Sequence, residues 1–201
     1  LEAAFDSAFG TEVRAPRDYA PRLDTQLERR VAMLADGSEG RIGVAAVDLA
    51  TGQTISILGD QRFPMASTSK IAIAATFLDG VDQGRWSLTS EFPLMVPVRS
   101  QRFSTAVAPV QAGEYLTAAE LIDLMITRSS NTATDALLAA VGGTSAVNAW
   151  ARRAGLNEFS LDRDIATLVR DDGEFDPAHH IDVRDSATPE AMVQLLAGIY
   201  Q

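Results

Sequence analysis

Residues 67–78 read Ser-Thr-Ser-Lys-Ile-Ala-Ile-Ala-Ala-Thr-Phe-Leu, and this stretch decides the fold. From residue 69 to residue 78, apolar side chains occupy every face of a helix, with no polar stripe to meet solvent. A helix that is hydrophobic all round lies in the interior of a protein. We therefore expect a central, buried helix that begins near Ser69 and ends at Gly80.

The chain before this helix carries the signals of one helix and one β-hairpin. After Pro21 an apolar stripe recurs with a period of 3.6, formed by Leu23, Leu27, Val31 and Leu34. It predicts an amphipathic surface helix that Gly37 ends. Residues 41–49 and 54–58 are rich in β-forming residues on either side of the turn signal Thr51-Gly52. They predict the two strands of the hairpin.

The chain after the central helix is mostly helical in its patterns. Pro93 and Pro97 break regular structure, so residues 99–111 are expected to form a loop or a short strand. The capping box Thr117-Ala118-Ala119-Glu120 predicts a helix that reaches about Ser129. Further helices are predicted over residues 131–141, over residues 145–154, and after Thr188-Pro189 with Met192, Leu195, Leu196 and Ile199 facing inward.

The composition narrows the class of protein. The 201 residues include 17 basic and 27 acidic side chains, a net charge of −10, and 46% are hydrophobic. The chain therefore has enough apolar residues to form a buried core. The lack of clustered Lys and Arg argues against nucleic acid as a partner. No apolar run approaches the roughly 18 residues of a membrane span, and the start of the chain lacks the pattern of an export signal. Cysteine is absent, which excludes disulfides and a thiolate nucleophile.

Ser67 and Lys70 form the first candidate site. They stand three residues apart at the start of the expected helix, so the hydroxyl and the amine project from one face within reach of each other. A serine becomes a nucleophile when a base takes its proton, and lysine can be that base where burial or nearby cations lower its pKa. This spacing also occurs by chance in a chain of this length, so the hypothesis needs further motifs.

Three stretches, in order, resemble the class A serine β-lactamases and their penicillin-binding relatives. The first is Arg62-Phe63-Pro64-Met65-Ala66-Ser67-Thr68-Ser69-Lys70, which contains the Ser-x-x-Lys signature. The second, Ser129-Ser130-Asn131, is similar to the family's Ser-Asp-Asn loop with serine in the middle place. The third, Arg184-Asp185-Ser186-Ala187-Thr188-Pro189, is similar to the end of the family's Ω-loop.

The resemblance implies a role for each matching residue. Ser67 would attack the lactam carbonyl and carry the acyl group, and its backbone N–H would supply half of the oxyanion hole. Lys70 would take or relay the proton of Ser67. Ser129 would pass a proton to the leaving lactam nitrogen. Asn131 would bind Lys70 and the side-chain amide of the substrate.

Other polar residues near these motifs are expected to be structural. Thr68 and Ser69 would cap and pack the start of the helix, and Ser130 stands where the family has an aspartate that braces its loop. The resemblance implies no cofactor and no metal. The pair His179-His180 with Asp182 is not expected to bind a metal, because adjacent histidines in a loop point apart in most geometries.

The expected Ω-loop departs from the family pattern. Arg163 fits its opening and would pair with Asp185 to close the loop, a structural role. The family's deacylating glutamate stands two residues after this arginine, and here that place holds Ile165. The possible substitutes in the loop are Asp164, Asp171, Asp172, Glu174 and Asp176. Glu174 is our choice among them, and the alternative is a solvated acidic loop.

The third signature of the family, Lys-Thr-Gly on a strand, does not occur in the sequence. In the family, this strand binds the substrate carboxylate within a five-stranded sheet. We expect an α/β (α+β) fold of the β-lactamase type, a helical lobe against an antiparallel sheet with only its first two strands. Residues 1–60 would form the N-terminal extension, helix and hairpin, and residues 61–201 the helical lobe. A complementary C-terminal segment or a swapped protomer would supply the missing strands.

The resulting hypothesis is a periplasmic or secreted serine β-lactamase that opens the β-lactam ring of antibiotics through an acyl-serine intermediate. Its substrate would be a small β-lactam or a molecule resembling a peptidoglycan peptide. Two alternatives stay open. One is a penicillin-binding D-alanyl-D-alanine peptidase or acylated sensor with slow deacylation, which the missing glutamate favours. The other is a non-catalytic module that keeps the fold.

Overall fold

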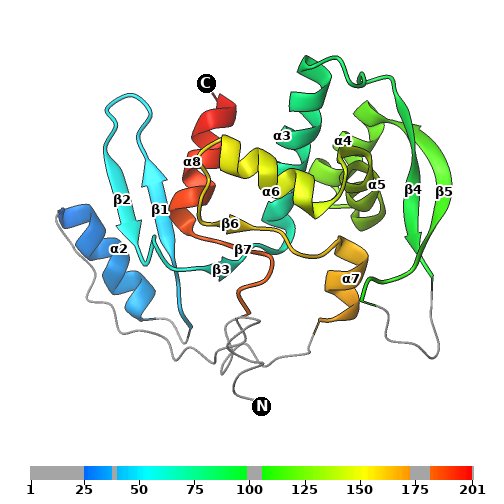
Figure 1. Ribbon diagram of the computed structural model, residues 1–201. Coiled ribbons are helices and arrows are strands. Elements are labelled where there is room, and N and C mark those ends of the chain that lie inside the picture. Colours follow the sequence, from blue (N-terminus) through cyan, green and yellow to red (C-terminus); the bar gives the residue numbers. More distant parts are fainter. Residues whose placement is uncertain (1–24, 38–39, 99–105, 173–181, 201) are drawn as a thin grey trace, which may run out of the picture. The chain divides into compact units, whose positions relative to one another are not determined.

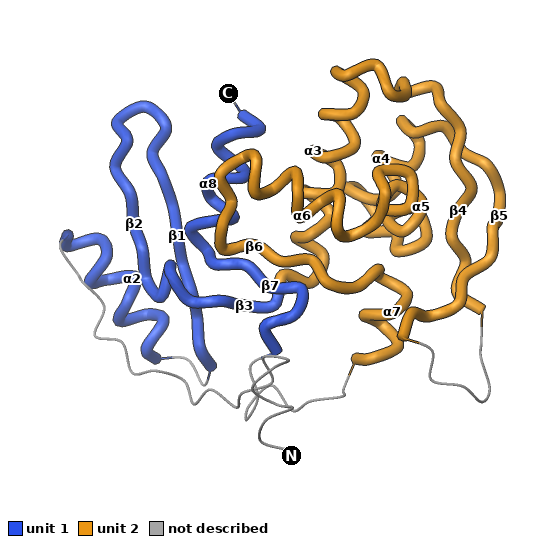
Figure 2. The backbone as a smooth tube through the Cα atoms, in the orientation of Figure 1, with its two compact units in different colours: residues 1–64, 173–201 blue, residues 65–172 orange. Residues whose placement is uncertain are grey.

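The computed structural model describes residues 25–37, 40–98, 106–172 and 182–200 (Figure 1). The chain forms two compact units (Figure 2): unit 1 is Leu1–Pro64 with Gly173–Gln201, and unit 2 is Met65–Asp172. The expected boundary between residues 60 and 61 stays a prediction for the domains of the protein. In this structure the C-terminal helix groups with the N-terminal elements.

Unit 1 is built around a β-hairpin. Its elements are α2 (Gln26–Asp36), β1 (Val44–Val47), β2 (Thr54–Ile57), β3 (Phe63–Pro64), β7 (Ser186–Ala187) and α8 (Pro189–Tyr200). β1 and β2 pair antiparallel, from Val44 opposite Ile57 to Val47 opposite Thr54, which confirms the predicted hairpin. α2 packs against β2 and α8 packs against β1. β3 and β7 form a second antiparallel pair.

The two helices of unit 1 expose part of their apolar faces. α2 begins with a capping box between Thr25 and Glu28, yet Leu34 on its apolar stripe is 80% exposed. In α8, Leu195 is buried as predicted, whereas Leu196 and Ile199 are 51% and 54% exposed. The inward orientation predicted for these two residues is wrong. An apolar stripe is buried only where another element covers it, and α8 packs on β1 along one side.

Unit 2 surrounds the predicted central helix. Its elements are the 3-10 turn η1 (Ala66–Thr68), α3 (Ser69–Asp82), β4 (Glu91–Pro97), β5 (Val110–Thr117), α4 (Ala118–Thr127), α5 (Asn131–Val141), α6 (Thr144–Arg153), β6 (Phe159–Ser160) and α7 (Ile165–Arg170). α3 packs against α4, α5 and α6. Its side chains Ala72, Ile73 and Phe77 are inaccessible to solvent, so the prediction of a buried central helix is confirmed.

Gly80 does not end α3, which continues to Asp82. A Cβ at Gly80 would collide with the ring of Trp86. That ring stacks on Phe77 at 5.1 Å between centroids, and its Nε1 donates a hydrogen bond to the Phe77 carbonyl at 2.9 Å. The glycine therefore makes room for an aromatic side chain, and the sequence signal of a helix stop is wrong here.

β4 and β5 form a long antiparallel ribbon where breaks are predicted around Pro93 and Pro97. The ribbon pairs Glu91 with Thr117 and Pro97 with Val110, with a register shift between Pro93 and Met95. Proline is tolerated at strand ends, at irregularities and on an edge that needs no N–H donor, and this two-stranded ribbon offers such positions. The predicted breaks at Pro93 and Pro97 are therefore wrong, whereas the sheet of β1 and β2 has the two strands expected and the ribbon is a separate sheet.

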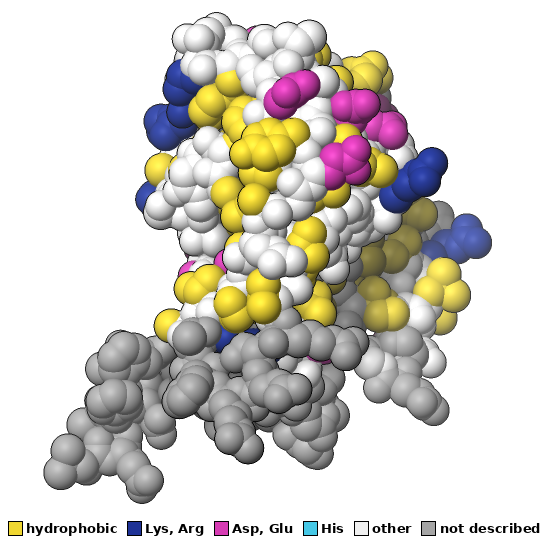
Figure 3. All heavy atoms as spheres, turned by 90° about the vertical axis from the view of Figure 1, so that its right-hand side faces the viewer, with side chains coloured by type: hydrophobic (Ala, Val, Ile, Leu, Met, Phe, Trp, Pro, Cys, Tyr) yellow, Lys and Arg dark blue, Asp and Glu magenta, His cyan; other side chains and the backbone are white. Residues whose placement is uncertain are grey.

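The face of unit 2 that includes the ribbon mixes hydrophobic and acidic side chains (Figure 3). Val98, Val107 and Tyr115 are exposed among the apolar residues of this region, and Glu91 and Glu114 are exposed among the acids. Within the described ranges, no helix has both the length and the apolar character that crossing a bilayer requires.

Candidate active site

The turn before α3 presents Ser67, and the first turn of α3 presents Lys70. Ser67 lies in η1 and is exposed, whereas the Lys70 side chain is buried, with 3% exposure. Ala66, directly before the serine, has a φ of 45°, in the left-handed region that side chains rarely adopt. The Lys70 Nζ lies 3.4 Å from the Ser67 Oγ. The two residues therefore meet as their spacing predicts.

Lys70 contacts the three other residues that the sequence singles out as catalytic or substrate-binding, Ser67, Ser129 and Asn131. Its Nζ donates to the Ser129 carbonyl at 2.8 Å, to the Ser129 Oγ at 2.7 Å and to the Asn131 Oδ1 at 2.9 Å. The Ser129 hydroxyl in turn donates to the Ser67 Oγ at 3.0 Å. Burial lowers the pKa of Lys70, and the negative charge of Asp135 opposes that effect. A buried amine with a lowered pKa, beside two hydroxyls, can accept a serine proton.

The loop between α4 and α5 holds Ser129 and Asn131 in place. Ser129 has a φ of 53°, and Ser130 is the N-cap of α5, where its side chain accepts from the Ala133 N–H at 3.3 Å. Asn131 is then the first residue of α5. The structural role expected for Ser130 is confirmed. Non-glycine residues in a left-handed conformation are enriched at functional sites.

Thr68 and Ser69 serve the turn rather than the reactive cluster. The Thr68 Oγ1 donates to the Met65 carbonyl at 2.6 Å, and the Ser69 Oγ donates to the Ala66 carbonyl at 2.8 Å. Both hydroxyls thus bind backbone groups of η1. The side-chain capping of α3 expected of them is wrong. Their contacts with turn carbonyls and the burial of Ser69 agree with a structural role.

Lys70 is also the only lysine in the 201-residue sequence. All other cationic side chains of fixed charge are arginines. This count is a signal that a motif search alone does not use. The lysine count singles out Lys70 without reference to its neighbours. Lysine side chains are normally exposed, so a surface role does not explain a single lysine that is buried.

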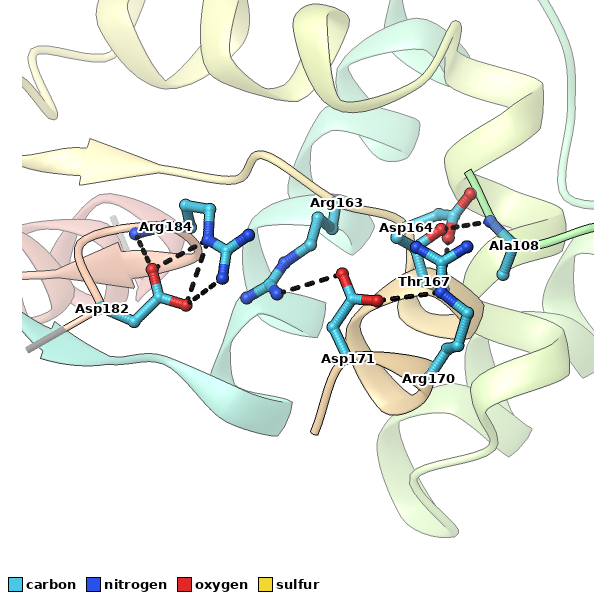
Figure 4. Close-up of polar contacts among 8 residues, drawn as sticks. All are labelled: Ala108, Arg163, Asp164, Thr167, Arg170, Asp171, Asp182 and Arg184. Atoms are coloured by element: carbon cyan, nitrogen blue, oxygen red, sulfur yellow. Dashed lines mark hydrogen bonds and ion pairs between the residues drawn. The ribbon is translucent and has the colours of Figure 1, made fainter. Parts of the chain in front are cut away.

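Arg163 and the acids near α7 form a local network (Figure 4). Arg163 lies 3.5 Å from Asp171, and Asp171 accepts from the Arg170 Nε at 2.8 Å. The hydrogen bond from Arg170 holds the pKa of Asp171 below its usual range. Asp164 is the N-cap of α7 and accepts from the Thr167 N–H at 2.7 Å. Two of the possible substitutes for the glutamate, Asp164 and Asp171, are thus engaged in holding α7.

Asp172 is the last residue of unit 2 and is exposed, and the rest of the expected Ω-loop belongs to unit 1 or lies outside the described residues. Asp185 is buried in unit 1, so its pairing with Arg163 stays a prediction. Arg184 binds the carboxylate of Asp182 at 2.8 to 3.1 Å. Glu174, Asp176, His179 and His180 lie outside the described residues. Among the residues that are described, no group of three potential metal ligands occurs.

Asp135 is a candidate that the sequence reasoning misses. Its carboxylate, 6% exposed on α5, accepts from the backbone N–H groups of Ile165 at 2.7 Å and Ala166 at 2.9 Å. Burial raises the pKa of Asp135 to about 6, against the effect of these two hydrogen bonds. The signal was available in the sequence: an acid one helical turn after Asn131, followed by the apolar residues of a buried helix.

A pocket of about 340 Å³ lies beside Asp135 in unit 2. Its polar lining includes Asp135, Arg163, Asp164 and Thr167, and Leu138 contributes to its apolar wall. Ser67 and Lys70 are not part of this lining. The pocket therefore belongs to the contact between the β4–β5 region, α5 and α7, and not to the cluster of Ser67 and Lys70.

Comparisons with known sequences agree with the motif assignment. Residues 26–201 match a family model described as the beta-lactamase enzyme family. Beta-lactamase CTX-M-8 of Citrobacter amalonaticus is 34% identical over 183 residues, which cover 90% of this chain and 58% of that protein. Beta-lactamase Toho-2 of Escherichia coli is 34% identical over 142 residues, 71% of this chain and 48% of that protein. The chain thus spans about half of the length of these relatives.

Comparisons with solved structures agree with the fold. An ancestral (GNCA) class A beta-lactamase superposes with a TM-score of 0.63 and 37% identity, covering 83% of this chain and 61% of that one. The structure of PBP-A superposes with a TM-score of 0.71 over 89% of this chain and 62% of that one. Its identity is 23%, so it supports the fold alone.

Proposed function

Because the chain belongs to the class A β-lactamase family, we propose that it is a serine β-lactamase-like hydrolase that opens the β-lactam ring through an acyl-Ser67 intermediate. One observation carries the proposal. The Lys70 Nζ contacts Ser129, Asn131 and Ser67 within a single cluster. This cluster contains a nucleophile, a proton acceptor and a proton donor for the leaving group.

The first half of the reaction uses these groups in order. The Ser67 Oγ attacks the lactam carbonyl carbon and its proton passes to the Lys70 Nζ, so an O–C bond forms and the amine becomes an ammonium ion. The lactam C–N bond then breaks, and the nitrogen takes the proton of the Ser129 hydroxyl. Lys70 replaces that proton across the 2.7 Å contact with Ser129. The net result is an acyl ester on Ser67 and a neutral amine base ready for the next step.

The second half requires a water molecule and a base. The place of the family's glutamate holds Ile165, which is 5% exposed and whose N–H is bound by Asp135. Glu174 stays our predicted base. The buried Ile165 favours a second candidate function, a penicillin-binding peptidase or sensor of the D-alanyl-D-alanine type that is acylated and then releases its product slowly.

The substrate, partner and location follow from the same proposal. A small β-lactam, or a molecule resembling a peptidoglycan peptide, would meet Ser67 at its exposed turn. A complementary C-terminal segment or a swapped protomer would complete the sheet that holds the family's Lys-Thr-Gly strand. Substrates of these two classes, β-lactams and peptidoglycan-like peptides, lie outside the cytoplasm, so we infer a periplasmic or secreted protein.

A chromogenic cephalosporin with the complete protein tests the proposal. Absorbance reports turnover, and intact mass reports an adduct on Ser67. Turnover supports the hydrolase, a persistent adduct supports the acylated receptor, and neither signal contradicts both and supports a non-catalytic module. Ser67→Ala should abolish adduct and turnover, whereas Ser145→Ala, an exposed serine on α6, should keep them. Full turnover by Ser67→Ala would overturn every acyl-serine mechanism.

A further inference from the structure

Asp135 stands on the same face of α5 as a residue that binds Lys70. Asn131 and Asp135 are four residues apart in one helix, so their Cβ atoms lie about 5–6 Å from each other on one face. The Asn131 Oδ1 accepts from the Lys70 Nζ at 2.9 Å. The carboxylate of Asp135 therefore lies one helical turn beyond a direct partner of the lysine.

Among the described residues, the direct partners of Lys70 are neutral oxygen atoms. They are two serine hydroxyls, the Ser129 carbonyl and the Asn131 amide oxygen. Throughout the described part of the chain, no carboxylate forms a hydrogen bond or ion pair with the Lys70 Nζ. A buried ammonium ion without a contacting counter-ion depends on charges at slightly greater distance.

The Asp135 carboxylate also forms hydrogen bonds with α7. Its two oxygens accept from the N–H groups of Ile165 and Ala166, the first two residues of that helix. These bonds fix the orientation of the carboxylate on α5. They also tie its ionisation to the position of the segment that in the family carries the deacylating base.

We propose that Asp135 is a positioning residue of the acyl-transfer reaction, whose buried carboxylate controls the charge state of Lys70 while it holds the start of α7. The effect of Asp135 on acyl transfer rests on the proposed function. When Ser67 gives up its proton, Lys70 becomes an ammonium ion, and the fixed negative charge of Asp135 stabilises that ion. Asp135 thereby makes Lys70 a stronger base than burial alone would leave.

The charges around the pair are consistent with this role. The negative charge of Asp135 opposes the burial that lowers the pKa of Lys70. Around Asp135 itself, Asp164 raises the pKa of the carboxyl and Lys70 lowers it. Asp162 and Arg163 line the same pocket as Asp135.

Direct titration of Lys70 tests the inference without any activity. Because Lys70 is the only lysine of this sequence, protein labelled with 15N at the lysine Nζ gives one side-chain signal. In Asp135→Asn, the midpoint of this signal should move to lower pH. A displacement of about 0.3 pH units, a two-fold change in the ratio of the two forms, is the smallest effect that counts. An unchanged midpoint would overturn the inference.

Asp164→Asn is the matched control. It removes one negative charge from the start of α7, the helix that Asp135 holds, and the causes that shift the pKa of Lys70 are burial and Asp135, not Asp164. Its lysine midpoint should stay within the same 0.3 units as a rough criterion. If Asp135→Asn does not fold, the unaltered chain still decides, since its lysine signal should show a second inflection where Asp135 titrates, near pH 6. A single, featureless titration would contradict the coupling.

Acylation kinetics separate this inference from the proposed function. With the complete protein, the acid limb of the rate of Ser67 acylation should move to lower pH in Asp135→Asn, and the plateau at high pH should fall because the lysine is a weaker base. A purely structural role would lower the rate equally at all pH values. If no adduct forms in the unaltered protein, the proposed function fails, while the lysine titration still supports or overturns the coupling.

Discussion

The Ser67 cluster and the α7 segment use charged side chains in opposite ways. At Ser67 one buried amine contacts neutral oxygens, and no carboxylate of the described residues contacts it. At α7 several carboxylates are present, but Asp164 caps the helix, Asp135 binds its first N–H groups and Asp171 pairs with arginines. A charge that is fully committed to its partners holds structure, whereas a buried charge with exchangeable partners can transfer a proton. The residue type alone does not distinguish the two.

Removing the amine should have the largest effect on this contrast. In Lys70→Ala, Ser67 loses its proton acceptor, and the acylation rate should fall by roughly 10²–10⁴-fold. The rate of mass increase with a β-lactam in excess measures it. Arg152→Ala removes an exposed cation of α6 and should acylate at the rate of the unaltered protein. Acylation by Lys70→Ala at an undiminished rate would place the proton acceptor elsewhere.

Asp135 should make the free energy of unfolding depend on pH. The pKa of Asp135 is raised from 3.8 to about 6 in the folded state, so between these values the folded chain holds a proton that the unfolded chain has released. This stabilisation is fully present below pH 3.8 and is lost as the pH rises through about 6. The free energy of unfolding, relative to Asp135→Asn, should therefore fall by up to about 3 kcal/mol from acid to neutral pH.

Denaturant titrations of both proteins at several pH values measure this difference. The comparison with Asp135→Asn cancels the contributions of the other acids, which both proteins share. A relative stability that rises with pH would show that the hydrogen bonds from α7 outweigh burial, and that Asp135 holds its charge more easily than its surroundings indicate.

The two N-caps should give the smallest effects and the sharpest contrast. Ser130→Ala and Asp164→Ala each remove a side chain that accepts a backbone N–H at the start of a helix, and each should cost about 1 kcal/mol of unfolding free energy. Ser130 lies between Ser129 and Asn131, so its loss should also slow acylation. Asp164→Ala should leave acylation unchanged. Equal acylation rates for the two variants would remove the distinction between the regions.

Local signals in the sequence predict much of the fold and of the reactive cluster. The capping box at Thr117 and the spacing of Ser67 and Lys70 depend on neighbours in the chain, and the structure reproduces them. Gly80 and Pro93 mislead because their surroundings come from outside their own segments: the ring of Trp86, which follows the helix, and the strand β5. A helix stop and a strand break are rules about isolated segments, and packing overrides them.

Asp135 and α7 are harder to predict for the same reason. α7 is six residues long, and two of its N–H groups are satisfied by a side chain some thirty residues earlier in the chain. No periodicity within such a short segment indicates that partner. Glu174 lies outside the described residues, and its role as a base stays a prediction from the sequence.

The left-handed backbone at Ala66 and Ser129 limits how this site can evolve. Of the four non-glycine residues with positive φ in the described chain, these two adjoin or belong to the reactive cluster. Each conformation costs on the order of 1 kcal/mol that glycine would largely recover. At Ala66, replacement by glycine can recover this free energy, because only a methyl group is lost. At Ser129 the same gain removes the hydroxyl that lies between Lys70 and Ser67, so selection for stability and selection for chemistry oppose each other at this position.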